Sequence, residues 1–299
     1  MSKIFAIVVS YNPDVDELRT QFDAIVSEGL SIIMIDNASA NFDELESCVR
    51  DIASANLSIQ RSPTNVGLAQ AQNLGVAEAK RRDASHVIFF DQDSIPQRGF
   101  IQELVAVESE LTRRGCKFAA VGPAAFDPTT SHHYPITKYV GPFIRRHYPR
   151  GAEPVEATFL ISSGSLVRMR ILDEIGAMRS ELFIDYIDVE WCLRAKSFGY
   201  RCFVASAARM SHRIGDSRIR FFGRTISAHS PIRRYYLVRN SLFMLRLAYV
   251  PMSYKVREVM LNLVRVAIFW YRSNDRPGYL RLMRRAVSDG IAGRFGKQL

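Results

Sequence analysis

The first 122 residues alternate between short apolar runs and longer segments with the periodicity of an amphipathic helix. The strand-like runs cover residues 4–9, 31–35, 57–60, 86–90 and 118–121, and the helix-like segments cover residues 15–28, 42–53, 67–82 and 99–114. Strands separated by helices predict βαβ units around a mostly parallel sheet. Right-handed crossovers then bring the loops at 10–13, 36–39, 63–67 and 91–96 to one edge of the sheet, where open α/β sheets bind ligands.

The second half of the chain is less regular. Residues 124–154 are rich in Pro, His and Gly and predict a loop-rich excursion with one β-hairpin. The later segments predict a strand at 155–160, a helix that ends near 175, a helix at 188–198, a strand at 201–204 and basic helices at 232–247, 253–271 and 279–291. We therefore expect an α/β domain over residues 1–230, in two parts (1–122 and 123–230), and a helical extension over residues 231–299.

Composition narrows the class of protein. Of the 299 residues, 47% are hydrophobic and 23% are charged, which favours a folded core and argues against disorder. The N-terminus enters a strand without the pattern of a secretory signal, and no uncharged apolar run approaches the ~18–20 residues of a membrane-spanning helix. The four cysteines are far apart in the sequence, a pattern that favours reduced thiols in a cytoplasmic protein over disulfides or a zinc site.

Positive charge is concentrated towards the C-terminus. Residues 209–299 contain 19 Lys and Arg against 4 Asp and Glu, a net of +15, whereas residues 1–208 contain 21 against 26, a net of −5; the two sum to +10. A basic third of this size predicts contact with an anionic lipid, a diphosphate or nucleic acid, or else a solvated basic face.

The most informative motif follows the fourth apolar run. Asp91 and Asp93 lie at i, i+2 directly after residues 87–90, so on an extended chain both carboxylates point to one side of the strand end. Two carboxylates this close repel each other unless a cation lies between them. Because oxygen ligands suit Mg²⁺ or Mn²⁺, which usually carry a substrate diphosphate, the motif predicts a metal–diphosphate site. A solvated turn is the structural alternative.

Other polar residues follow the strands at the same edge. Asp36 either accepts a hydrogen bond from the N3–H of uracil or thymine, or caps the next helix. Asn65 and Gly67 precede a helix start rich in small residues, which either presents free N–H groups to an anion or allows close helix packing. The segment does not match G-x-G-x-x-G, so it does not predict a dinucleotide site.

Three acids lie among aromatic residues further along the chain. Asp185, Asp188 and Glu190 are costly in such surroundings unless each has a partner or a task. Asp188 falls at an expected helix start, so it is a candidate general base or a helix cap. Glu190 lies four residues before Arg194 and is able to pair with it.

Two basic side chains are further candidates. His212 becomes a metal ligand only if folding brings it to Asp91 and Asp93. Arg239, in the basic segment 233–240, either reaches a diphosphate or belongs to a basic surface with aromatic packing.

In their order along the chain, these motifs resemble family 2 inverting glycosyltransferases with a GT-A fold. The resemblance spans about residues 4–240, and the segments that carry it are 8–13, 36–39, 65–67, 73–75, 91–93, 185–194 and 235–240. It is nearest to bacterial rhamnosyltransferases that use dTDP-L-rhamnose, and galactofuranosyltransferases share the same arrangement. The implied fold is α/β, with a Rossmann-like, mostly parallel central sheet flanked by helices and a C-terminal helical extension.

The resemblance implies a role for each matching residue. Residues 1–122 would form the nucleotide-binding half and residues 123–230 the acceptor-binding half. The residues implied to bind the nucleotide sugar are Ser10, Tyr11, Asp36, Asn65, Gly67, Asp91 and Arg239. The residues implied to bind Mg²⁺ or Mn²⁺ are Asp91, Asp93 and His212. Asp188 is the implied catalytic base, and the residues implied to support the acceptor are Asp185, Glu190 and Trp191.

The implied enzyme transfers L-rhamnose from dTDP-β-L-rhamnose to a hydroxyl of a glycan or lipid-linked glycan in cell-surface polysaccharide synthesis, such as O-antigen or cell wall. Three alternatives stay open: a UDP-sugar donor, a nucleotidyltransferase, and a non-catalytic binder of anionic polymers. A nucleotidyltransferase usually has a glycine-rich basic loop near its first strand, which this chain lacks, and a polymer binder leaves the acids without a purpose, so we expect no nucleic-acid partner. The apolar and basic C-terminal helices predict either peripheral contact with the anionic inner face of the membrane or a homodimer interface.

Overall fold

The computed structural model describes residues 3–51, 57–141, 143–213, 217–221, 224–228 and 230–298. The N-terminal strands β1 (Ile4–Ser10), β2 (Ser31–Asp36), β3 (Leu57–Arg61) and β4 (His86–Asp91) run parallel, as predicted, and their order in the sheet is β3-β2-β1-β4. The helices between them, α1 (Val15–Ser27), α2 (Phe42–Asp51) and α3 (Leu68–Arg81), begin and end within two residues of their expected limits. The loops after these strands therefore share one edge of the sheet.

The sheet continues beyond β4 with strands that the sequence predicted only in part. β10 (Leu166–Arg168) lies antiparallel between β4 and β6 (Phe118–Phe126), and β11 (Arg201–Ser211) runs parallel to β6. The short strands β5 (Ile95–Pro96) and β9 (Val155–Ala157) pair antiparallel with β11. Six of the nine strands that the described residues place in this sheet thus run in one direction, which confirms a mostly parallel sheet.

Two differences from the expected strands affect the site. β10 was not predicted, because three residues are too few to carry a periodic signal before α5 (Met169–Ile175). β11 continues seven residues beyond the expected end at 204, since it pairs with β6 as far as Ser211 after a register shift between Ala205 and Arg209. This longer strand carries the chain to His212.

The remaining elements lie outside or across this sheet. α4 (Phe100–Arg113) and α6 (Ile187–Ser197) match their predictions within a residue, and a 3₁₀ turn (Ser180–Leu182) precedes α6. The predicted hairpin in the loop-rich stretch is formed by β7 (Ile136–Val140) and β8 (Phe143–His147). A second hairpin, β12 (Ser217–Phe221) with β13 (Arg224–Ala228), was not predicted.

Both faces of the sheet are covered by helices, as the continuous apolar strands require. In β1, Ala6 and Val8 pack with Phe22 and Phe100 of α1 and α4, whereas Ile7 on the other face packs against α3 and its neighbours. Neighbouring residues of one strand thus belong to two separate cores.

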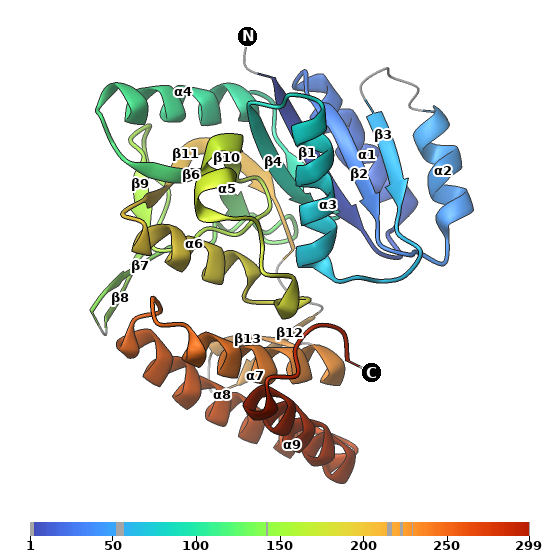
Figure 1. Cartoon of the computed structure of the whole chain (residues 1–299), viewed down its shortest axis with the longest axis vertical. Coiled ribbons are helices and arrows are strands. Elements are labelled where there is room, and N and C mark those ends of the chain that lie inside the picture. The colour runs from blue at the N-terminus through green and yellow to red at the C-terminus, as the bar shows by residue number, and fades with distance from the viewer. Residues whose placement is uncertain are drawn as a thin grey trace.

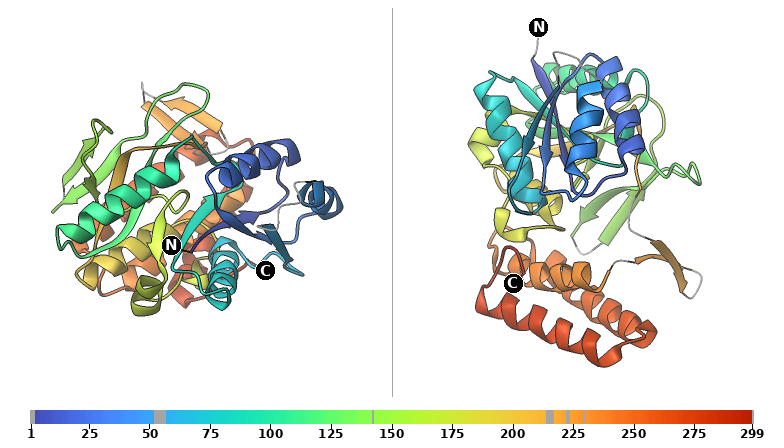
Figure 2. Two further views of the ribbon diagram at one scale, coloured as in Figure 1. Left: turned by 90° about the horizontal axis from the view of Figure 1, so that it is seen from above. Right: turned by 90° about the vertical axis from the view of Figure 1, so that its right-hand side faces the viewer.

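Three C-terminal helices, α7 (Pro231–Arg246), α8 (Met252–Arg272) and α9 (Arg276–Ala292), form a layer that faces the carboxyl ends of the parallel strands (Figures 1 and 2). Their starts lie one to three residues before the predicted ones. For α7 and α9 the reason is capping, since Ser230 Oγ and Asp275 Oδ1 accept backbone N–H groups of the first turn and a proline follows each cap. None of the helices in the described part of the chain has the length and apolarity needed to cross a bilayer.

A buried carboxylate ties α4 to the sheet. Glu108 accepts hydrogen bonds from His86 Nε2 (2.8 Å) and Arg168 Nε (2.5 Å), so one side chain joins α4, β4 and β10. Burial alone would raise the pKa of Glu108, but the bonds to His86 and Arg168 outweigh it and lower the pKa below 4.5.

We predict that Glu108→Gln lowers the free energy of unfolding by about 1.5–3 kcal/mol at pH 7, because bonds between ionised groups are replaced by weaker neutral ones. An acid whose pKa is lowered by folding stabilises above its unfolded pKa, so the difference should vanish as the pH falls below 4.5 through the folded pKa. Urea unfolding at several pH values measures both effects. The control is Glu110→Gln on the same helix, because the partners of Glu110 within the described residues are exposed arginines and its loss should leave stability unchanged. An equal loss of stability in both variants would contradict the assignment.

Candidate active site

The carboxyl edge of the sheet brings Asp91, Asp93 and His212 together. Nδ1 of His212 lies 3.2 Å from Asp93 Oδ1, and its Nε2 lies 4.0 Å from Asp91 Oδ2. One ligand atom from each residue lies within 4.8 Å of the other two. β11 delivers the histidine, because Ser211 pairs with Ile95 just beyond the acidic motif.

The charges of this cluster favour a divalent cation. Burial raises the pKa of Asp91, and the charge of Asp93 adds to the increase, while His212 opposes it. The pKa of His212 is also raised, because the hydrogen bond to Asp93 and the charges of Asp91, Asp93 and Asp188 outweigh its burial. Two carboxylates and one imidazole are a donor set that Mg²⁺ and Mn²⁺ accept, so the residues present fit such an ion.

Buried polar side chains hold the strand-end loop in place. Gln21 of α1 donates to the carbonyl groups of Asp91 and Ser94 through Nε2, at 2.6 Å each. Ser163 Oγ accepts the backbone N–H of Asp91 (3.1 Å) and donates to Ser94 Oγ (2.7 Å), which lies 2.8 Å from Nδ1 of His212. Gln21 and Ser94 were not predicted as site residues, although a glutamine within the apolar stripe of a helix was an available signal.

The first two strand-end loops lie beside the acidic motif. The backbone N–H of Tyr11 donates to Gln92 Oε1 (2.8 Å), and the tyrosine side chain is 48% exposed. Asp36 is fully buried and accepts bonds from Ser10 Oγ (3.3 Å) and the Ser39 N–H (3.1 Å). Asp36 therefore holds the turn after β2, which precedes the start of α2 at Phe42, so this contact is not the predicted helix cap.

The third loop joins α3 to the segment before α6. Asn65 Oδ1 accepts from Asn37 Nδ2 (3.1 Å) and from the Gly67 N–H (3.0 Å). Gly67 has a φ of +86°, and a Cβ there would lie 2.5 Å from Cδ2 of Phe183. The next residue, Leu68, donates its N–H to the Phe183 carbonyl at 2.7 Å. The glycine thus permits the close packing that the sequence offered as one alternative.

The segment before α6 has an unusual backbone. Phe183, Asp185 and Tyr186 have φ values of 64°, 64° and 65°, a region that costs about 1–3 kcal/mol for a residue other than glycine. The hydroxyl of Tyr186 donates to Glu258 Oε2 at 2.8 Å. This strain lies immediately before Asp188, so surrounding contacts must set the position of that carboxylate.

Helix α7 supplies much of the restraint on this segment. Asn240 Nδ2 donates to the carbonyl groups of Leu182 and Ile184, at 2.7 Å each. The guanidinium of Arg239 donates to the Leu182 carbonyl at 3.3 Å and to the Gly296 carbonyl at 2.5 Å. The basic extension therefore shapes the edge of the α/β domain directly.

Asp188 lies in the first turn of α6. Its Oδ1 accepts the N–H of Val189 at 2.8 Å, and the described part of the chain gives it no ion pair. Burial, with additional repulsion from Asp91 and Asp185, raises its pKa to about 6 despite that hydrogen bond. Asp188 also lines a mainly apolar cavity of about 290 Å³. The charge of Asp91 helps raise the pKa of Asp188, and the charge of Asp188 helps raise the pKa of His212, so Asp188 lies within electrostatic range of the acidic cluster.

The other predicted acids have close partners. Asp185 pairs with Arg233 Nη2 at 3.1 Å. Glu190 is fully buried and forms a two-pronged bond with Nε and Nη2 of Arg194, at 3.0 Å each. Trp191 donates its Nε1–H to the Gly176 carbonyl at 2.9 Å. Glu190 and Trp191 thus anchor α6 in the core.

The structure also places Arg239 differently from its predicted role. It is 1% exposed, and its donors are taken by backbone carbonyl groups and by Asn240, so a diphosphate contact would require these bonds to break. Arg233, one of the residues in the same basic segment, exerts a charge effect on Asp91 that lowers its pKa. The two arginines are six residues apart on one helix and so lie on different faces.

Comparison with known proteins identifies the family. The model of "Glycosyl transferase family 2" matches residues 5–176. The chain is also 34% identical over 297 residues to "dTDP-rhamnosyl transferase RfbF" of Shigella flexneri, a match that covers 99% of this chain and 97% of the relative. The chain belongs to glycosyl transferase family 2.

Solved structures of other glycosyltransferases have the same fold. The glycosyltransferase superposes on the mannosyltransferase PcManGT of Pyrobaculum calidifontis, solved with GDP-Man and Mn²⁺, with a TM-score of 0.57, 15% identity and coverage of 99% and 76% of the two chains. It superposes on GalNAc-T7, solved with UDP, GalNAc and Mn²⁺, with a TM-score of 0.59, 14% identity and coverage of 87% of this chain and 55% of GalNAc-T7. The expected GT-A glycosyltransferase fold is thereby confirmed.

We predict that Gly67→Ala lowers the transfer rate at least tenfold. The new Cβ would meet the ring and carbonyl oxygen of Phe183 at 2.5–2.7 Å and push the strained segment that positions Asp188. Steady-state kinetics and the melting temperature measure the effect. Gly29→Ala is a matched control, because its φ of +78° gives a similar backbone strain but no atom lies within 4 Å of the added Cβ. Equal activity losses in the two variants would contradict the proposed link to Asp188.

Proposed function

We propose that this glycosyltransferase moves L-rhamnose from dTDP-β-L-rhamnose to a hydroxyl of a glycan or lipid-linked glycan in cell-surface polysaccharide synthesis, such as O-antigen or cell wall. The observation that carries the proposal is that Asp188, which has no ion pair within the described residues, lies within electrostatic range of the cluster of Asp91, Asp93 and His212. The full-length similarity to a dTDP-rhamnosyl transferase supports the choice of donor.

The donor would lie across the carboxyl edge of β1 to β4. Asp91, Asp93 and His212 would hold Mg²⁺ or Mn²⁺, which when bound neutralises the charge of the departing diphosphate. Arg233, whose charge lowers the pKa of Asp91, would add positive charge there. The nucleoside would lie over the exposed Tyr11, beside the loops that carry Ser10, Asp36, Asn65 and Gly67.

Asp188 would serve as the general base. It takes the proton from the acceptor hydroxyl as that oxygen bonds to the anomeric carbon, while the bond from this carbon to the diphosphate oxygen breaks and dTDP leaves. A single displacement inverts the anomeric configuration, so a β-L donor gives an α-L-linked product. A pKa near 6 leaves the carboxylate ionised at pH 7 and makes it more basic than an exposed aspartate.

We predict that Asp188→Asn reduces dTDP release from dTDP-rhamnose and Mn²⁺ by about 10²–10⁴-fold, the typical contribution of a general base. The melting temperature should stay equal or rise. The raised pKa of Asp188 shows that burial of its charged form costs stability, and the neutral amide of asparagine avoids that cost. For the wild type, kcat/KM should fall about tenfold per pH unit below about pH 6, as the base becomes protonated.

The control for this assay is Asp173→Asn. Asp173 lies on α5 and forms an exposed ion pair with Lys80 of α3, so this variant should retain activity. EDTA should abolish turnover, and parallel reactions with UDP-sugars test the alternative donor. Full activity of Asp188→Asn would refute the base assignment, and turnover of a UDP-sugar in place of dTDP-rhamnose would refute the rhamnose donor.

We further propose that α8 rests on the anionic inner face of the cytoplasmic membrane. Five side chains on one face of this helix are more than half exposed: Met252, Val256, Met260, Leu263 and Val264. Residues 252–292 contain 8 Lys and Arg against 3 Asp and Glu, a net of +5. An apolar stripe with flanking cations is the pattern of a helix that lies in the membrane interface, and the charge favours anionic lipid over a second copy of the same basic surface.

We predict that the protein floats with liposomes that contain anionic lipid, and that the double variant Val256→Asp, Met260→Asp does not. Gln102→Asp, exposed on the distant helix α4, is the control and should float as the wild type does. Light scattering in solution tests the homodimer. The membrane proposal is overturned if the wild type does not float with liposomes and instead forms a dimer that the double variant disrupts.

A further inference from the structure

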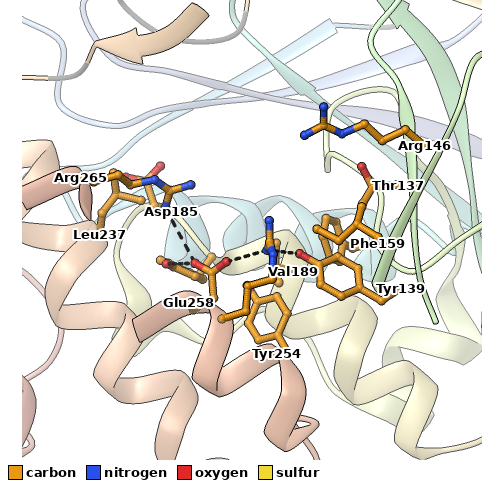
Figure 3. A pocket seen from close by; sticks show the side chains of 13 residues that line it. Thr137, Tyr139, Arg146, Phe159, Asp185, Val189, Leu237, Tyr254, Glu258 and Arg265 are labelled. Carbon is orange, nitrogen blue, oxygen red and sulfur yellow. Dashed lines mark hydrogen bonds and ion pairs between the residues drawn. The ribbon is translucent and has the colours of Figure 1, made fainter. Parts of the chain in front are cut away.

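A cavity of about 320 Å³ lies between the β7–β8 hairpin, the start of α6 and helices α7 and α8 (Figure 3). We call it the arginine cavity, because Arg146 of β8 and Arg257 and Arg265 of α8 line it. Its aromatic wall is formed by Tyr139, Phe159, Tyr186 and Tyr254.

The acids of this cavity are already neutralised. Asp185 pairs with Arg233 at 3.1 Å. Glu258 accepts the hydroxyl of Tyr186 at 2.8 Å and Nη1 of Arg257 at 3.2 Å, and Nη1 of Arg265 lies 3.8 Å from it. The positive charge of the arginines that line the cavity therefore exceeds the negative charge of these two acids.

Arg146 accounts for the excess. Within the described residues it has no acidic partner, and Figure 3 shows its guanidinium reaching into the cavity from the side opposite Arg265. Ile144 and Arg146 line the cavity whereas Arg145 does not, because alternate residues of a strand point to opposite faces. Three guanidinium groups around one opening, against two paired acids, form a surface complementary to an anion.

The position of the cavity relates the anion to the acceptor. The cavity shares Thr137, Phe159 and Val189 with the apolar cavity that Asp188 lines, so the two spaces adjoin beside the proposed base. The metal-site residues Asp91, Asp93 and His212 do not line it. An anion bound in the arginine cavity is thus separate from the diphosphate of the donor.

We propose that the arginine cavity binds a phosphate or diphosphate group of the acceptor, an inference that rests on the proposed glycosyl transfer. Arginine forks match phosphate oxygens, and the aromatic wall would pack against an adjoining sugar ring. The group belongs either to a lipid diphosphate or to a phosphorylated glycan without lipid. The outer face of α8 is apolar and exposed, which places a lipid tail within reach of the same helix.

The test measures binding in EDTA, so that a metal-bound diphosphate does not contribute. The probes are geranyl diphosphate, inorganic pyrophosphate and geraniol, titrated calorimetrically into the full-length protein. We expect both diphosphates to bind and geraniol not to bind, with at least tenfold weaker affinity in Arg146→Ala and in Arg265→Ala. Arg145→Ala, which removes the exposed arginine next to Arg146, is the matched control and should bind as the wild type does.

The outcomes of these titrations distinguish a lipid-linked phosphate group from one without lipid, and they test this inference separately from the proposed sugar transfer. Tighter binding of geranyl diphosphate than of pyrophosphate supports a lipid-linked acceptor, and equal affinities support a phosphate group without lipid. Absence of diphosphate binding, or equal loss in the Arg145 and Arg146 variants, overturns the inference. Because binding in EDTA requires no turnover, failure of sugar transfer would leave this result intact, and dTDP binding with Mn²⁺ should be unchanged in Arg146→Ala.

Discussion

The site depends on the contacts by which α7 and α3 hold the strained segment before α6 in place. Phe183, Asp185 and Tyr186 occupy left-handed backbone conformations that cost free energy. Asn240 satisfies the carbonyl groups of Leu182 and Ile184, and the absence of a Cβ at Gly67 lets α3 pack directly against Phe183. These contacts come from segments more than 50 residues away on one side and more than 100 on the other. Together they fix the start of the helix that carries Asp188.

The electrostatics of the site follow from which acids have partners. Glu190 and Asp185 lie close to Asp188 in sequence, yet each has an arginine beside it. Asp188 accepts a backbone N–H and has no ion pair within the described part of the chain, and burial keeps its pKa high. Asp91 and Asp93 share one histidine, which leaves negative charge that a divalent ion would neutralise. Within the described residues, the carboxylates of Asp91, Asp93 and Asp188 thus have no arginine partner, which makes them the candidates for chemistry.

The C-terminal helices contribute contacts and lining residues around the candidate active site. One face of α7 holds the segment before Asp188, and one face of α8 supplies two arginines and Glu258 to the cavity beside it. The opposite face of α8 exposes a row of apolar side chains. The basic extension thus forms one wall of the cavity beside the α/β domain, on the side of the proposed acceptor.

The sequence by itself determined the βαβ half, the edge of the sheet that carries the loops, and the candidate carboxylates, because apolar periodicity and short motifs are local signals. It also offered the pairing of Glu190 with Arg194 and the packing role of Gly67 as alternatives, without a means to choose. Only the tertiary structure decided that His212 reaches Asp93, since the two are brought together by the register of β11 against β5 and β6. It likewise directed Arg239 to backbone carbonyl groups and left Arg146 facing a cavity, because the partners of a long side chain depend on segments that are distant in the sequence.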